Sequence, residues 1–202
     1  TMGFPGWAYG VVYFILGSLV TRVKMDEKKA LGIAEKRDGA RGPENVWGSA
    51  GTSMLCALAI RFLNMGDVMT ASLKVAFTAA MATKLSDTFG SEIGKAYGKT
   101  CYLITDFKLV PRGTEGAVSL EGTLAGVIAS IIMAYASKAL GLISCGKDIA
   151  AVLVSAIVAT TAESYIGAIF QDSVPWLTNE LVNFINTTIG AVVAFLFVAF
   201  FH

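Results

Sequence analysis

The second half of the chain contains three long apolar stretches with few charged residues. They cover residues 118–140, 149–170 and 181–201. Each is about as long as the roughly 20 residues that a helix needs to cross the hydrocarbon core of a bilayer. Within lipid, such a segment can satisfy its own backbone hydrogen bonds only as a helix. The chain is therefore predicted to be an integral membrane protein.

The first half of the chain carries three weaker candidates for membrane spans, at residues 3–20, 46–63 and 68–85. Hydrophobic residues make up 54% of the 202 residues, which is more than an ordinary soluble domain contains. We therefore expect an all-α membrane protein, a bundle of about six transmembrane helices that forms a single domain over residues 1–202.

The distribution of basic residues predicts how this bundle is oriented. With six spans, the connections 1–2, 3–4 and 5–6 lie at one membrane face, which we call the loop face. Twelve basic residues belong to these connections, against about four at the other face. They are Arg22, Lys24, Lys28, Lys29, Lys36, Arg37, Arg41, Lys84, Lys95, Lys99, Lys108 and Arg112. By the positive-inside rule the loop face is cytoplasmic, or stromal in a plastid. The net charge of +1 gives no reason to expect a nucleic-acid partner.

The chemistry available to the chain is limited by its histidine and cysteine content. His202, the last residue, is the only histidine, which argues against a Ser/His/Asp triad and a histidine-rich metal site. Cys56, Cys101 and Cys145 show neither metal nor disulfide spacing. Any reaction must therefore rely on carboxylates, amides, hydroxyls, lysine and arginine.

Polar residues of four predicted spans gather at the loop face. They are Lys84 and Asp87 at the end of the third span, Glu121 and Thr123 at the start of the fourth, Glu163 in the fifth, and Asn179, Asn183 and Asn186 at or just before the start of the sixth. Glu163 and Asn186 are expected at a similar depth, roughly 10 Å below this face. Ionisable groups inside a bilayer are costly and often functional, although asparagines can also hold helices together and a glutamate can pair structurally with a lysine. Convergence of the whole set favours a site.

Two loop segments have the character of phosphate-binding sequences. Residues 111–116 combine Arg112 with Gly113 and Thr114, so that a guanidinium and accessible backbone N–H groups can meet an anion. Residues 35–43 resemble them, although such a basic run is more often solvated or in contact with lipid headgroups. By contrast, Gly98-Lys99-Thr100 is not a P-loop, because its spacing is one residue short and no strand–helix context surrounds it.

Carboxylates beside these segments predict a Mg²⁺ site, since Mg²⁺ prefers a few carboxylates, water and substrate phosphates. The candidates are Asp87, Glu92 and Glu163. Asp87 and Glu92 are five residues apart, about 140° around a helix, so they can share an ion only if the helix breaks. Gly90 and Gly94 make such a break plausible.

Three blocks, at residues 35–49, 85–126 and 162–190, resemble the membrane family that includes phytyl-phosphate kinase of the vitamin E pathway. The most specific motifs are Ser-Asp-Thr-Phe-Gly-Ser-Glu-Ile-Gly and Pro-x-Gly-Thr-x-Gly-x-Val-Ser-Leu-x-Gly-Thr. The blocks cover somewhat under half of the chain. The first of them is closer to the plant and cyanobacterial branch than to animal and archaeal relatives.

The resemblance implies a membrane-embedded, Mg²⁺-dependent kinase in a plastid or cyanobacterial membrane. It would transfer a phosphoryl group from a nucleoside triphosphate, with CTP as the expected donor, to the lipid phytyl phosphate, giving phytyl diphosphate. We assign Mg²⁺ to Asp87, Glu92 and Glu163, and nucleotide or lipid phosphates to Lys36, Arg37, Lys84, Lys95, Arg112, Gly113, Thr114, Asn183 and Asn186.

Other functions compete with this interpretation. A transporter predicts inverted repeats or polar groups at both faces, and the sequence shows neither. A plain structural bundle would not collect its polar residues at one face. A prenyl-alcohol kinase, or another CTP-dependent lipid enzyme, would share the same site and could use Asp87 as a base, so this alternative stays open.

Overall fold

The computed structural model describes residues 2–39, 42–171 and 173–201, and most of them are helical. The six long helices are α1 (Gly3–Thr21), α3 (Pro43–Phe62), α4 (Asp67–Tyr97), α5 (Leu120–Ala139), α6 (Gly146–Ile166) and α7 (Asn179–Phe201). The shorter ones are α2 (Met25–Ala30), the 3₁₀-helix η1 (Lys36–Gly39) and the π-helix η2 (Gly167–Gln171), which continues α6. Each predicted span corresponds to one long helix, and the predicted fold class, a helical membrane protein, is confirmed.

Four helices in the described part of the chain are both long and apolar enough to cross a membrane on their own: α1, α5, α6 with its extension to Phe170, and α7. By this criterion α3 and α4 do not qualify as membrane spans, so the predicted number of about six spans is reduced to four. The reason is the central position of α4, which packs against α1, α3, α5, α6 and α7. A helix enclosed by protein can carry polar side chains that lipid would not tolerate.

Helix α4 runs without a break for 31 residues, far beyond the end predicted at residue 85. The expected break at Gly90 and Gly94 is therefore wrong. Both glycines face α5, where a Cβ on Gly122 would lie 2.5 Å from the Gly90 carbonyl oxygen and 3.3 Å from Gly94 Cα. They serve close packing of the two helices, which agrees with the packing role expected of small residues in membrane helices.

A small antiparallel sheet, absent from the predictions, covers the loop face. It consists of β1 (Cys101–Leu103), β2 (Leu109–Val110) and β3 (Ala117–Ser119), in the order β2-β1-β3. Ser119 ends β3 and caps α5, because its Oγ accepts a hydrogen bond of 3.1 Å from the Gly122 N–H. The connection between α4 and α5 is thus an ordered structure rather than an open loop.

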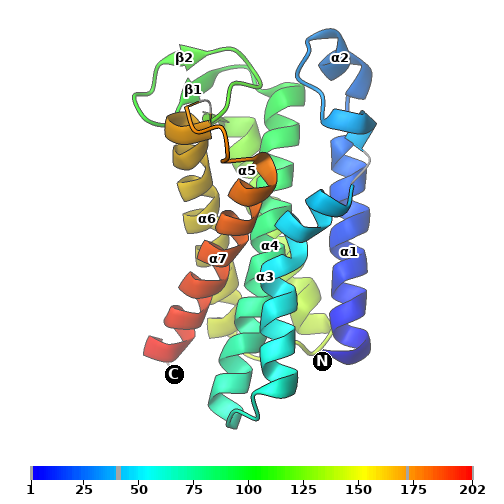
Figure 1. Ribbon diagram of the computed structural model, residues 1–202, viewed down its shortest axis with the longest axis vertical. Helices are drawn as coiled ribbons and strands as arrows, with labels where there is room; N and C mark the ends of the chain where they lie inside the picture. The colour runs from blue at the N-terminus through cyan, green and yellow to red at the C-terminus, as the bar shows by residue number, and fades with distance from the viewer. Residues whose placement is uncertain (1, 40–41, 172, 202) are drawn as a thin grey trace.

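Figure 1 shows α2 and the sheet at one end of the bundle, and the start of α1 and the end of α7 at the other. The connections α1–α3, α4–α5 and α6–α7 lie at the same end as the sheet. This arrangement is the alternation of connections that the sequence predicts, and it brings the segments with most of the basic residues together at the loop face.

Candidate functional site

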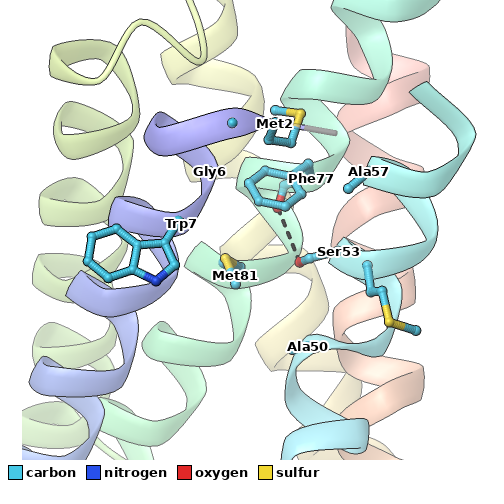
Figure 2. Close-up of a pocket in the computed structure, with 10 residues that line it drawn as sticks. Met2, Gly6, Trp7, Ala50, Ser53, Ala57, Phe77 and Met81 are labelled. Atoms are coloured by element: carbon cyan, nitrogen blue, oxygen red, sulfur yellow. Dashed lines mark hydrogen bonds between the residues drawn. The ribbon is translucent and has the colours of Figure 1, made fainter. Parts of the chain in front are cut away.

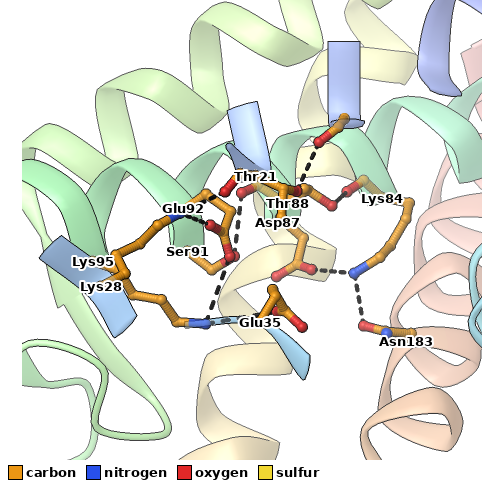
Figure 3. A network of polar contacts seen from close by, with 11 residues as sticks. Thr21, Lys28, Glu35, Lys84, Asp87, Thr88, Ser91, Glu92, Lys95 and Asn183 are labelled. Atoms are coloured by element: carbon orange, nitrogen blue, oxygen red, sulfur yellow. Dashed lines mark hydrogen bonds and ion pairs between the residues drawn. The ribbon is translucent and has the colours of Figure 1, made fainter. Parts of the chain in front are cut away.

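The buried ammonium group of Lys84 is the centre of the candidate site. Lys84 lies on α4 with 6% of its surface exposed. Its Nζ donates hydrogen bonds to Asp87 Oδ2, one turn further along α4, at 2.6 Å and to Asn183 Oδ1 of α7 at 2.7 Å (Figure 3). One lysine therefore links two helices that are about a hundred residues apart in the sequence.

Glu163 of α6 completes this group, because its half-buried carboxyl lies near the Asp87 carboxyl and the charge of Lys84. We call Lys84, Asp87, Glu163 and Asn183 the Lys84 cluster. Two neighbouring carboxylates repel each other when both are ionised, and this repulsion favours a cation between them. The cluster thus combines an ammonium group, which can bind phosphate, with two carboxyl groups, which can bind a metal ion.

Asn186 lies one helical turn deeper on α7 and is fully buried. Its Oδ1 and Nδ2 have no hydrogen-bond partner among the described residues, and neither does the buried Oγ1 of Thr83 on α4. Buried polar groups are rarely left unpaired in proteins, so these atoms are suited to bind water or a ligand. Asn183 does bridge two helices, whereas Asn186 makes no such bridge.

A second polar group, which we call the Lys28 cluster, lies nearer the loop face and contains Lys28, Glu35, Glu92 and Lys95. The fully buried Lys28 Nζ donates to the Thr21 carbonyl at 2.7 Å and forms an ion pair with Glu92. Lys95 Nζ lies 3.7 Å from carboxylate oxygens of both Glu35 and Glu92 (Figure 3). These contacts hold the α1–α3 connection against the last turns of α4.

Glu92 is therefore not brought together with Asp87 and Glu163, which is a correction to the expected metal site. Because α4 stays helical, Glu92 points about 140° away from Asp87. Its charge is balanced by Lys28 and Lys95. In the described part of the chain, no three acidic, histidine or cysteine side chains are grouped closely enough to hold a metal ion by themselves.

Arg112, in the loop before β3, fastens that loop to α2 and α4. Its Nη1 donates to the Ala96 carbonyl at 3.2 Å and lies 3.4 Å from Glu27 Oε1. The hydrogen bond from Lys24, with a further contribution from Arg112, lowers the pKa of Glu27. Arg112 is thus paired in this structure, although about a third of its side chain is exposed.

The next residues of this loop lie near the α1–α3 connection. Gly113 adopts φ +85° and lies against Ile33, where a side chain would clash. Thr114 is exposed, and its Oγ1 donates to the Pro111 carbonyl at 2.9 Å. This segment therefore packs against the α1–α3 connection at the loop face, while Thr114 is exposed to solvent.

The remaining predicted phosphate-binding residues lie at the rim. Arg37 is exposed and forms an ion pair of 2.5 Å with Glu44 at the start of α3. The side chain of Lys36 lies outside the described residues. Gly98 ends α4 and is followed by β1, so Lys99 comes after a helix rather than before one, in agreement with the rejection of a P-loop.

Sequence reasoning missed Lys28, Glu35 and Thr83. Lys28 stands beside Lys29 in a charged run, a pattern that is usually solvated, so no local signal distinguishes it. Thr83 is one of many small residues in α4. One residue expected at the loop face, Thr123, is exposed on α5.

Comparison with known proteins shows that the chain is similar to a family of integral membrane proteins. A family model described as integral membrane protein DUF92 matches residues 1–191. A membrane protein of the cyanobacterium Synechocystis sp. is 54% identical over 193 residues, which is 96% of this chain and 74% of that protein. The chloroplast protein VTE6 of Arabidopsis thaliana is 47% identical over 196 residues, which is 96% of this chain and 59% of VTE6.

The similarity extends to an archaeal protein. A membrane protein of Methanocaldococcus jannaschii is 34% identical over 201 residues, which is 96% of this chain and 77% of that protein. No solved structure matches the chain. The chain spans less than two thirds of VTE6, so what it shares with that protein is the membrane region described above.

Proposed function

This chain belongs to the DUF92 family of integral membrane proteins, and on that premise we propose that it is a membrane-embedded prenyl-phosphate kinase. It would transfer a phosphoryl group from a nucleoside triphosphate, with CTP as the donor, to phytyl phosphate. The observation that carries the proposal is the Lys84 cluster, in which side chains from α4, α6 and α7 meet toward the loop-face ends of their helices. The motif blocks that resemble the phytyl-phosphate kinase family supply much of this cluster.

The location of the cluster suits a reaction between a lipid and a water-soluble nucleotide. A prenyl phosphate keeps its hydrocarbon chain in the bilayer and its phosphate at the interface. A cluster a few helical turns below the loop face lets the nucleotide approach from water while the lipid approaches from the side. Holding the two reactants together in this way removes much of the entropic cost of the reaction.

The residues present fit a Mg²⁺ ion held by two protein carboxylates rather than three. Asp87 and Glu163 are near one another, and Mg²⁺ commonly takes one or two carboxylates and completes its shell with water and substrate phosphates. We assign the ion to this pair and leave out Glu92, which is neutralised by lysines. When bound, Mg²⁺ would supply positive charge to the transferred phosphoryl group.

The other side chains of the site would bind and orient the phosphates. Lys84 provides a buried ammonium, and Asn183 holds it in place. Asn186 has a free amide that can orient phosphate oxygens or metal-bound water. The acceptor is already an anionic phosphate, so the reaction depends on positioning and charge neutralisation and needs no strong general base.

We assign the nucleotide phosphates to the loop face, where Lys36, Arg37, Lys95, Arg112, Gly113 and Thr114 are found. Lys95 and Arg112 are paired with glutamates at 3.4–3.7 Å, which is longer than a strong ion pair. Both are partly exposed, so a triphosphate can replace the glutamates as their partner.

A prenyl-alcohol kinase is the second candidate, because the Asp87–Glu163 pair could accept the proton of a hydroxyl group. The two functions differ in their acceptor. Purified protein should therefore be assayed with phytyl phosphate and with phytol, each with four nucleoside triphosphates, with and without Mg²⁺. We expect phytyl diphosphate from phytyl phosphate and CTP only when Mg²⁺ is present. Product from phytol alone would replace the proposal by the second candidate.

The variants Asp87→Asn and Glu163→Gln test the site assignment. Each removes one carboxylate of the proposed Mg²⁺ pair, so each should reduce turnover by at least about a hundredfold while the protein stays folded in detergent. Glu121→Gln, also at the loop-face end of the bundle but outside the Lys84 cluster, is the matched control and should keep near-normal turnover. Normal turnover in both site variants would remove the assignment.

A further inference from the structure

An apolar groove of about 280 Å³ opens between α1 and α3, in the part of the bundle away from the loop face (Figure 2). Its floor is formed by Phe77 and Met81 of α4, and its walls include Gly6 and Trp7 of α1 and Ala50 and Ala57 of α3. The hydroxyl of Ser53, a polar residue of the lining, donates to the Phe77 carbonyl at 3.3 Å. The groove therefore offers hydrocarbon contacts and little else.

The floor of the groove lies on the same side of α4 as Lys84. Phe77, Met81 and Lys84 are spaced i, i+4, i+7 along α4, so they lie on one face of that helix. Lys84 is about 4.5 Å above Met81 along the axis, in the direction of the loop face. The α1 wall continues in the same direction, since a Cβ on Gly10 would lie 3.6 Å from Met81 Cε and Tyr13 follows one turn later on that helix.

We propose that this groove holds the hydrocarbon chain of the lipid substrate while the phosphate lies at Lys84. The inference rests on the proposed kinase function and adds the subsite that selects the prenyl chain. An amphiphile with one anionic end matches a buried cation about one turn beyond an apolar groove, whereas a zwitterionic lipid brings no net charge to that cation. Trp7 and Met54 at the rim are exposed, so the chain can enter sideways from the bilayer.

Such a groove would discriminate between prenyl phosphates by chain length, and it would add little to their binding affinity. A chain that moves from lipid into an apolar groove gains no hydrophobic free energy, because both surroundings are apolar. It gains alignment of its phosphate with the nucleotide, provided that the rest of the chain fits the space. The depth of the groove should therefore decide which prenyl phosphates react well.

The alanines of α3 allow this depth to be probed. Ser53 is level with Phe77 through its hydrogen bond, and α3 runs away from the loop face. Ala50 is therefore one turn nearer to Lys84 than Ser53, and Ala57 is one turn further away. A phenylalanine at Ala50 would fill the near end of the groove, and a phenylalanine at Ala57 would fill the far end.

The test compares dimethylallyl, geranyl and phytyl monophosphates, in order of increasing chain length, as acceptors. Ala57→Phe should raise KM for phytyl phosphate by about tenfold or more and spare the two shorter substrates. Ala50→Phe should impair both geranyl and phytyl phosphate. Ala71→Phe, at an exposed position of α4 outside the groove, is the control and should change none of the three values. Equal effects on every chain length, or none, would overturn the proposal.

A photoreactive analogue of phytyl phosphate, applied without nucleotide, separates this inference from the kinase function. Labelling of α1 and α3 peptides that excess phytyl phosphate suppresses would support the groove. Labelling spread over the lipid-facing surface of α5, or suppressed equally by an ordinary phospholipid, would assign the groove to bulk lipid. If the wild-type protein phosphorylates no prenyl phosphate but is labelled in the groove, the kinase proposal fails and the lipid subsite remains.

Discussion

At the scale of single residues, the most unusual feature is a lysine with no exposed surface. Lys28 belongs to the six-residue helix α2, yet its ammonium is enclosed by the Thr21 carbonyl and the Glu92 carboxylate. A buried charge is tolerated only when it is paired, and removing one partner leaves the other uncompensated. The Lys28–Glu92 pair is therefore a structural connection between the loop face and α4.

Lys28→Met should destabilise the protein by about 3–5 kcal/mol, because it leaves Glu92 buried with only the more distant Lys95 as partner. Adding Glu92→Gln should recover much of the loss by removing the uncompensated charge. Unfolding of the purified protein in mixed detergent micelles would measure both effects. Lys29→Met, at the exposed neighbouring position, should change stability by no more than about 0.5 kcal/mol. Equal stability of the Lys28→Met and Lys29→Met variants would contradict this account.

At the scale of elements, the contact between α4 and α5 depends on glycine. Gly122 faces Gly90 and Gly94, and Gly126 faces Ser86, whose Oγ donates to the Gly126 carbonyl at 2.9 Å. Close approach of the backbones gives α4 firm support over the turns that carry the Lys84 cluster. Since lipid provides no hydrophobic driving force between helices, such packing is a main source of cohesion in the bundle.

Gly122→Ala should therefore destabilise the protein by roughly 1–3 kcal/mol, because the added methyl group would lie 2.5 Å from the Gly90 carbonyl oxygen. Gly146→Ala, at the start of α6, is the matched control, since a Cβ there has no neighbouring atom within 4 Å. The same detergent unfolding measurement applies to both. A Gly122→Ala protein as stable as the control would show that the two helices can separate at no cost.

At the scale of the whole molecule, the bundle has two different ends. The sheet, α2 and most basic segments lie at one end, and the short α3–α4 and α5–α6 connections lie at the other with both termini (Figure 1). The Lys84 cluster lies nearer the first of these ends, from which we expect a nucleotide to approach. We propose that this loop face is cytoplasmic in a cyanobacterial membrane, or stromal in a plastid.

Single cysteines introduced into a protein that lacks Cys56, Cys101 and Cys145 would test this orientation. Thr114→Cys, exposed at the loop face, should react with a membrane-impermeant maleimide only from the cytoplasmic or stromal side. Gly66→Cys, in the α3–α4 connection, should react only from the opposite side. Labelling of sealed vesicles of known orientation gives the answer, and the reverse pattern would refute the assignment.

Local apolarity and residue spacing were enough to predict the helices and the end of the bundle at which the polar side chains lie. The apolar runs that became α5, α6 and α7 required helices in a membrane, because lipid leaves the backbone no other partner. The alternation of spans then put Lys84, Asp87, Glu163 and Asn183 toward the same end of the bundle. The membrane family, too, could be recognised from the motif blocks alone, and the family match confirms it.

The pairing of these side chains, by contrast, depends on contacts between residues that are far apart in the sequence. Nothing local distinguishes Lys28 from its exposed neighbour Lys29, and the burial of its charge depends on Glu92, which is 64 residues away. Gly90 and Gly94 suggest a helix break when the sequence is considered alone. In the structure both pack against Gly122 of α5, and α4 is continuous. That continuity turns Glu92 away from Asp87, because the direction of a side chain on a helix depends on every residue between them remaining helical.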